Sequence, residues 1–110
     1  MENSATTGRM ASPQGLFGLE REMGYSRAAF LDLLPRVAAG HSVSIEDSQV
    51  RISLANGQVW IRLGEERIRY FTENVQFPIL PVSIEFVGVD EQAQIAFIRR
   101  FDQAYLKGLG

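Results

Sequence analysis

The strongest constraint on the fold is a change in the spacing of apolar residues along the chain. Between residues 43 and 70, apolar and polar side chains alternate, as in the segments VRISL (50–54) and VWIRL (59–63). A period of two is typical of strands with one buried face, whereas helices have a period of 3.6. Helical spacing occurs before and after this stretch. The chain therefore predicts a central antiparallel sheet between two helices.

Two helices are expected. Ser26 is the predicted N-cap of the first, in which Pro35 predicts a kink or a break before the end at Gly40. Its apolar stripe consists of Phe30, Leu33, Leu34 and Val37. The second helix is expected from Asp90 to about Leu106. Its stripe recurs every four residues, at Ala93, Phe97, Phe101 and Tyr105.

Turn-forming residues divide the alternating stretch into strands. Asp47-Ser48 predicts the first reversal, Asn56-Gly57 a two-residue hairpin loop, and Gly64-Glu65 the next turn. We interpret residues 72–81, which contain two prolines and no clear period, as a loop or an edge crossing. A last strand is expected over residues 82–87.

These elements predict an α+β fold. We expect a two-layer sandwich, with an antiparallel meander of four to five strands and the N-terminal and C-terminal helices packed on one face. The 110 residues suit one small soluble domain. Residues 1–18 are rich in small and polar residues and are expected to form a disordered N-terminal tail, so that residues 19–110 form a single α+β domain.

Several chemistries lack their residues in this sequence. The chain has no cysteine, and its one histidine, His41, falls in an expected turn. The acidic pairs Glu46-Asp47 and Glu65-Glu66 are interpreted as solvated turn residues. The glycines match neither a phosphate-binding loop nor a dinucleotide fingerprint. We therefore expect no catalytic residues, no metal site and no cofactor, in a protein that is not an enzyme.

The sequence also bears on location. The N-terminal residues contain no apolar run of the kind that a secretory signal needs, and no segment has the apolar length of a membrane span. We expect a cytoplasmic protein that does not bind membranes.

Charge is unevenly distributed along the chain. The formal net charge is −2, yet residues 50–71 carry four arginines against two glutamates. The expected hairpin places Arg51 opposite Arg62, and the turn that follows places Arg67 or Arg69 opposite Arg62. Like charges directly opposite each other destabilise a sheet, so this surface requires a carboxylate or a binding partner.

The leading functional hypothesis is a non-enzymatic interaction or accessory domain that uses the outer sheet face. Its partner is another protein or, as a homodimer, a second copy of the chain. The predicted partner surface consists of Arg51, Trp60, Arg62, Arg67 and Arg69. Aromatic residues and arginine are enriched in interfaces, and the chain has ten arginines and one lysine.

Three alternatives remain open at this point. The same surface could bind single-stranded nucleic acid, with arginines on phosphates and Trp60 stacked on a base. A small apolar ligand could lie between helices and sheet, lined by Phe30, Phe86, Phe97, Phe101 and Tyr105. The arginines could instead pair with carboxylates such as Glu85, Glu65 and Glu66, or with those of the N-terminal tail, on an ordinary solvated face. No family motif is recognised.

Overall fold

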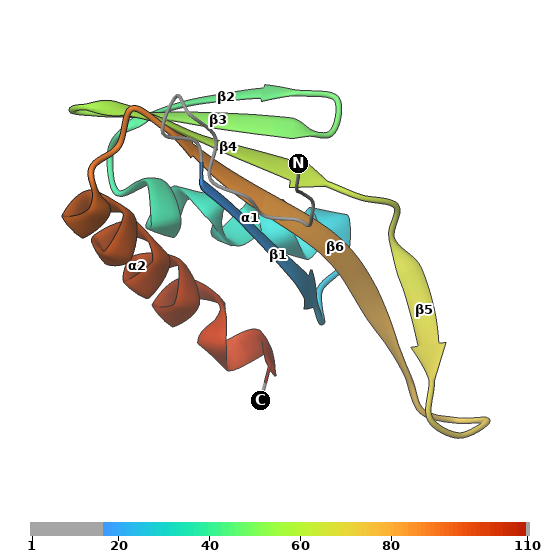
Figure 1. Cartoon of the computed structure of the whole chain (residues 1–110). Coiled ribbons are helices and arrows are strands. Elements are labelled where there is room, and N and C mark those ends of the chain that lie inside the picture. The colour runs from blue at the N-terminus through green and yellow to red at the C-terminus, as the bar shows by residue number, and fades with distance from the viewer. Residues whose placement is uncertain (1–16, 110) are drawn as a thin grey trace, which may run out of the picture.

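A computed structural model describes residues 17–109 as six strands and two helices (Figure 1). Their bounds are β1 (Phe17–Met23), α1 (Arg27–Ala38), β2 (Ser42–Glu46), β3 (Gln49–Leu54), β4 (Gly57–Leu63), β5 (Arg67–Tyr70), β6 (Gln76–Val87) and α2 (Glu91–Leu109). The sheet has the order β1-β6-β4-β3-β2, and β5 pairs with β6. Every strand pair is antiparallel.

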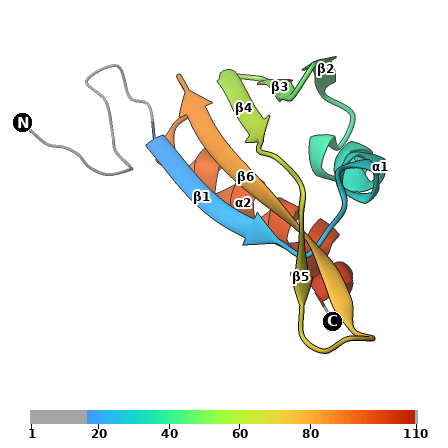
Figure 2. The same ribbon diagram turned by 90° about the vertical axis from the view of Figure 1, so that its right-hand side faces the viewer.

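The expected fold class is confirmed, because α1 and α2 cover one face of an antiparallel sheet (Figures 1 and 2). Residues 1–16 of the expected tail lie outside the described residues, whereas Phe17 and Gly18 begin β1. This first strand was not expected, and it brings the number of strands to six. In the part of the chain that is described, no helix is long and apolar enough to cross a membrane.

Aromatic side chains fill the space between helices and sheet. Phe30 of α1 stacks on Tyr105 of α2 with ring centroids 4.7 Å apart. Phe86 of β6 meets Phe97 of α2 edge to face at 5.7 Å. The five aromatic residues considered as a ligand lining are all buried, and each packs against at least one of the others.

Both predicted N-caps are confirmed. The Ser26 hydroxyl accepts a hydrogen bond from Ala29 N at 3.1 Å, and the Asp90 carboxylate accepts one from Ala93 N at 2.8 Å. The helix α1 runs through Pro35 without a break and ends at Ala38; its C-cap residue, Ala39, adopts the left-handed conformation and its backbone N–H donates to Pro35 O. Pro35 is exposed, and it removes a single helical hydrogen bond, the one that a backbone N–H at this position would donate to the carbonyl of Leu31.

The register of the β3–β4 hairpin differs from the predicted one by two residues. Leu54 pairs with Gly57, so the loop is Ala55-Asn56 and not Asn56-Gly57. Gly57 has φ +119°, and a Cβ atom there would clash with Val87 O. Glycine is therefore required at the first position of β4, because β6 passes close by. A shift of two leaves every side chain on its predicted face.

The sequence interpretation was wrong for the region after β4. Residues 76–81, expected in a loop, form the first half of β6, and β5 pairs with β6 and not with β4. Both edges of β4 are already occupied, by β3 and by β6. Gly64-Glu65 is therefore no reversal, and the chain continues along the same edge of β6 from Leu63, opposite Val82, to Arg67, opposite Ile79.

The result is a two-stranded extension that we call the arm, residues 67–79. It consists of β5, the turn 71–75 and the first four residues of β6. Figures 1 and 2 show the arm projecting beyond the rest of the sheet. We call the rest of the sheet, together with the two helices, the body.

Candidate functional site

The five residues of the predicted partner surface separate into two groups. Arg51, Trp60 and Arg62 lie on the outer face of the body, which is the face away from the helices. Arg67 and Arg69 lie on the arm. Arg62 faces Gln49 on one side and Ser83 on the other, so the expected row of three arginines is wrong.

Trp60 makes its contacts within the body. Arg51 lies directly opposite on β3, with its guanidinium carbon 4.6 Å from the ring centroid, a cation–π contact. The indole Nε1 donates to Gln58 Oε1 at 2.8 Å, and Glu85 faces Trp60 from β6. The indole N–H and one ring face of Trp60 therefore already have partners from the same sheet.

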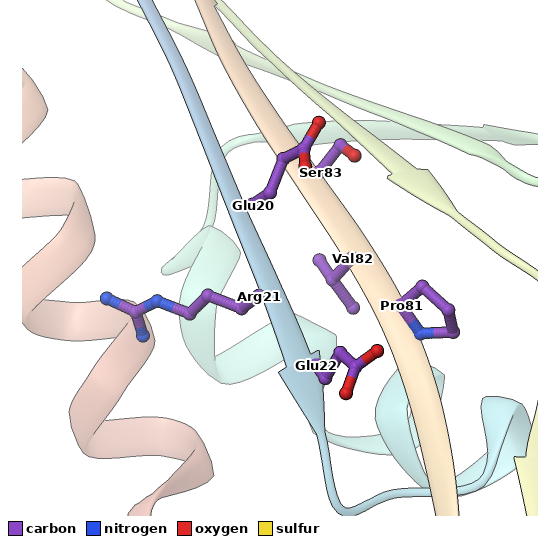
Figure 3. Close-up of a pocket in the computed structure, with 6 residues that line it drawn as sticks. All are labelled: Glu20, Arg21, Glu22, Pro81, Val82 and Ser83. Carbon is purple, nitrogen blue, oxygen red and sulfur yellow. The ribbon is translucent and has the colours of Figure 1, made fainter. Parts of the chain in front are cut away.

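The outer face of the body is acidic, not basic. By register it carries Glu20 and Glu22 on β1, Glu46 on β2 and Glu85 on β6, four carboxylates against the two arginines Arg51 and Arg62. Figure 3 shows Glu20 and Glu22 over β6, beside Ser83 and Pro81, where they line a shallow groove. Arg21 points the other way, toward α2, and pairs with Asp102.

Glu22 attaches the arm to the body. Its Oε2 atom lies 2.8 Å from Arg67 Nη2, and its Oε1 atom lies 3.7 Å from Arg69 Nη2. The hydrogen bond and the charge of Arg67, together with the charge of Arg69, lower the pKa of the Glu22 carboxyl below its ordinary value of 4.5. Sequence reasoning missed this carboxylate because β1 was not expected.

A second carboxylate, Glu66, fixes the chain directly before the arm. Glu66 Oε1 accepts a hydrogen bond from Arg27 N, at the N-terminus of α1, at 2.8 Å. The Arg27 side chain in turn donates to Ser48 Oγ at 3.0 Å and to the Asp47 carbonyl, both in the β2–β3 turn. The start of the arm, the first turn of α1 and the β2–β3 turn are thus linked.

The arm carries most of the exposed large apolar side chains. Nine such residues occur among the described residues, and five lie within residues 68–77: Ile68, Tyr70, Phe71, Val75 and Phe77. Tyr70 and Phe71 are 67% and 68% exposed. Phe71 meets Phe77 edge to face at 5.2 Å. The other four are Val43 and Ile45 on β2, and Ile95 and Leu106 on α2.

The tip of the arm, residues 72–74 within the turn, is polar and contains local hydrogen bonds. Thr72 Oγ1 accepts hydrogen bonds from Asn74 N at 3.2 Å and from Val75 N at 3.1 Å, and Glu73 is exposed beside them. The apolar side chains therefore lie along the sides of the arm and not at its tip. A partner would have to contact the arm from the side.

The described part of the chain contains no cluster of side chains of the kind that binds a metal ion. Across residues 17–109, no three histidine, aspartate or glutamate side chains come together as metal ligands. His41 is exposed, and its backbone N–H donates to Ala38 O.

Comparisons with family models, with curated proteins and with solved structures found no match for this chain.

Proposed function

We propose that this chain is a non-enzymatic protein-interaction domain and that its contact element is the arm rather than the outer sheet face. The supporting observation is the concentration of exposed apolar side chains on the arm. Taking about 200 Å² for each ring-bearing side chain, Tyr70, Phe71 and Phe77 expose about 350 Å² between them. Tyr70 lies on one face of the arm, and Phe77, in contact with Phe71, lies on the other, so both faces expose apolar surface. Exposed apolar patches on a protein mark interaction sites.

The charge of the arm favours a protein partner over nucleic acid. Arg67 and Arg69 are paired with Glu22, and Glu65, Glu66 and Glu73 add further negative charge nearby. The outer face of the body also carries more carboxylates than arginines. A polyanion gains little from such a surface.

The experiment measures solution mass by light scattering together with binding of the apolar dye ANS. If the arm is the contact element, it is either covered, so that the mass exceeds one chain, or open, so that a single chain binds the dye. In both cases the variant Tyr70→Ser/Phe77→Ser loses the signal, because both side chains are exposed on the arm. The matched control on the outer face, Trp60→Gln, keeps it.

Two results would contradict the proposal. One is a wild-type protein with the mass of a single chain and no dye binding. The other is an association that survives the arm variant and is lost in Trp60→Gln, which would return the contact to the outer face.

A further inference from the structure

The sheet extends three strands beyond β6 where β4 pairs with it but only one strand where β5 pairs with it, and we call the open space beside β5 the step. Leu63 of β4 and Arg67 of β5 lie in succession along one edge of β6, opposite Val82 and Ile79. The strands β3 and β2 extend the sheet beside β4 only. In the described part of the chain, the outer edge of β5 and the outer edge of β2 are therefore both open, and both face away from β6 in the same direction.

Hydrogen-bond direction identifies the free backbone groups of β5. Across the turn of the arm, Phe71 N donates to Val75 O at 2.8 Å. In an antiparallel pair, successive residues point their backbone groups to opposite edges. Arg67 and Arg69 therefore bond toward β6, whereas the N–H and C=O groups of Ile68 and Tyr70 point to the open edge.

The free backbone groups of β2 follow from the hairpin that it forms with β3. Glu46 pairs with Gln49 across the two-residue turn Asp47-Ser48, and the pair that closes such a turn is hydrogen-bonded. Ser44 therefore bonds toward β3, and the backbone groups of Val43 and Ile45 point to the open edge. Neither edge contains proline. The other edge of the arm does contain one, Pro78, which offers no N–H and disfavours strand pairing there.

We propose that the arm pairs with a second copy of this chain, the open edge of β5 lying antiparallel to the open edge of the second copy's β2; the inference rests on the proposed function of the arm. The hydrogen-bonding residues coincide when Ile68 lies opposite Ile45 and Tyr70 opposite Val43. The same register places Arg67 opposite Glu46 and Arg69 opposite Ser44.

This register is complementary on both faces. On the helix side it joins four exposed apolar residues, Ile68 and Tyr70 with Val43 and Ile45. On the outer side it places an arginine opposite a glutamate, which is a favourable cross-strand pair. It also gives the arm a third strand, and a two-stranded ribbon alone is only marginally stable in water.

The contact closes on itself. Under a two-fold axis perpendicular to the sheet, β2 of each copy lies in the step beside β5 of the other copy. The two edge contacts are then equivalent, and no open-ended filament forms. The hairpin β2–β3 closes at the level of Arg62, opposite Ser83, and β5 begins four positions away, opposite Ile79. At about 3.3 Å per residue, about 13 Å separates these levels, which leaves room for the two facing turns.

The experiment uses engineered cysteines, since the chain has none of its own. Ser44 and Arg69 form a non-hydrogen-bonded pair in the proposed register, with Cα atoms about 4.5 Å apart, within the range for a disulfide. Within one chain they lie on separate edges, with β3 and β4 between β2 and β6. In a glutathione redox buffer, Ser44→Cys/Arg69→Cys is expected to give a covalent dimer. Each single variant should run as one chain.

A matched control exchanges the same residue types on the same strands and face. In Ser42→Cys/Arg67→Cys, the two cysteines would be four positions out of register, about 13 Å apart, and should not link. A second variant does not depend on cysteine chemistry. Ile45→Lys, at a side chain that is 51% exposed, should fold normally and halve the mass measured for the wild type by light scattering.

Three results would overturn the inference, and the third leaves the proposed function standing. The first is equal linking of both cysteine pairs, and the second is linking of the control pair alone. The third is a wild-type protein with the mass of one chain, whose dye binding still depends on Tyr70 and Phe77. That result would assign the arm to a different protein.

Discussion

The two halves of β6 lie in opposite environments. From Val82 to Phe86 the strand has β1 on one edge and β4 on the other, and the alternate residues Leu80, Val82, Ile84 and Phe86 are buried under the helices. From Gln76 to Ile79 it has only β5 beside it. The body buries most of its apolar residues, whereas five of the nine exposed large apolar side chains of the described residues lie on the arm, and for this reason we propose the arm as the contact element.

Two phenylalanines on β6 give the largest contrast. Phe86 is fully buried and packs on Phe97, so Phe86→Ala should cost about 3–5 kcal/mol of the free energy of unfolding. Phe77 is 43% exposed and contacts Phe71 on the arm, and Phe77→Ala should cost about 1 kcal/mol or less. Urea unfolding followed by circular dichroism measures both. Equal losses would mean that the arm is part of the folded core.

Two tyrosines give a smaller contrast. The Tyr105 hydroxyl donates to Phe30 O at 2.7 Å, so Tyr105→Phe should cost about 1 kcal/mol, whereas Tyr70→Phe should change little because Tyr70 is exposed. Burial, with the nearby Tyr25 phenol as a smaller cause, raises the pKa of Tyr105 above its ordinary value of 10.

The raised pKa also sets a pH dependence. The folded state holds the phenolic proton, so this contribution to stability is complete below pH 10 and is lost as the pH rises through the raised value. Unfolding midpoints between pH 9 and 11 should fall for the wild type and fall less for Tyr105→Phe. Identical slopes would contradict the assignment.

The smallest contrast concerns the attachment of the arm. Glu22→Gln removes the charge that pairs with Arg67 and Arg69, so amides of β5 should exchange faster while the global unfolding midpoint stays unchanged. Glu20→Gln, two residues earlier on the same face, is the control (Figure 3). Because the pKa of Glu22 is lowered, the attachment is complete above pH 4.5 and weakens as the pH falls through the lowered value. Equal exchange in both variants would show that Glu22 does not hold the arm.

Local signals were sufficient for most of the body. Alternation and helical spacing predicted β2, β3, β4, the end of β6 and both helices. The N-caps Ser26 and Asp90 were predictable because each side chain bonds to a nearby backbone N–H of its own helix. β1 was missed, although Leu19 and Met23 lie on the buried face with Glu20 and Glu22 on the other. The polar residues before β1 led us to expect a tail over residues 1–18, whereas Phe17 and Gly18 already belong to β1.

The candidate site depends on which strands pair with each other, and the spacing of apolar residues along the sequence does not determine strand pairing. Gly64-Glu65 has the residues of a turn, but both edges of β4 are occupied by other strands. The chain therefore continues along β6, and Glu66 contacts Arg27 there. Pro78 and Pro81 also led us to expect a loop where the first half of β6 forms. The sequence predicted that a row of arginines as a whole needs a carboxylate or a partner, whereas the pairing of Glu22 with Arg67 and Arg69 required the tertiary structure.

We infer that the open edges of β5 and β2 form a binding surface, and amide hydrogen exchange can test this residue by residue. The amides of Val43, Ile45, Ile68 and Tyr70 point to those edges, whereas those of Arg67 and Arg69 bond within the arm. We expect the four edge amides to be protected at high protein concentration and to lose protection on dilution, with Arg67 and Arg69 unchanged. Edge amides that exchange at the same unprotected rate at every concentration would contradict the account.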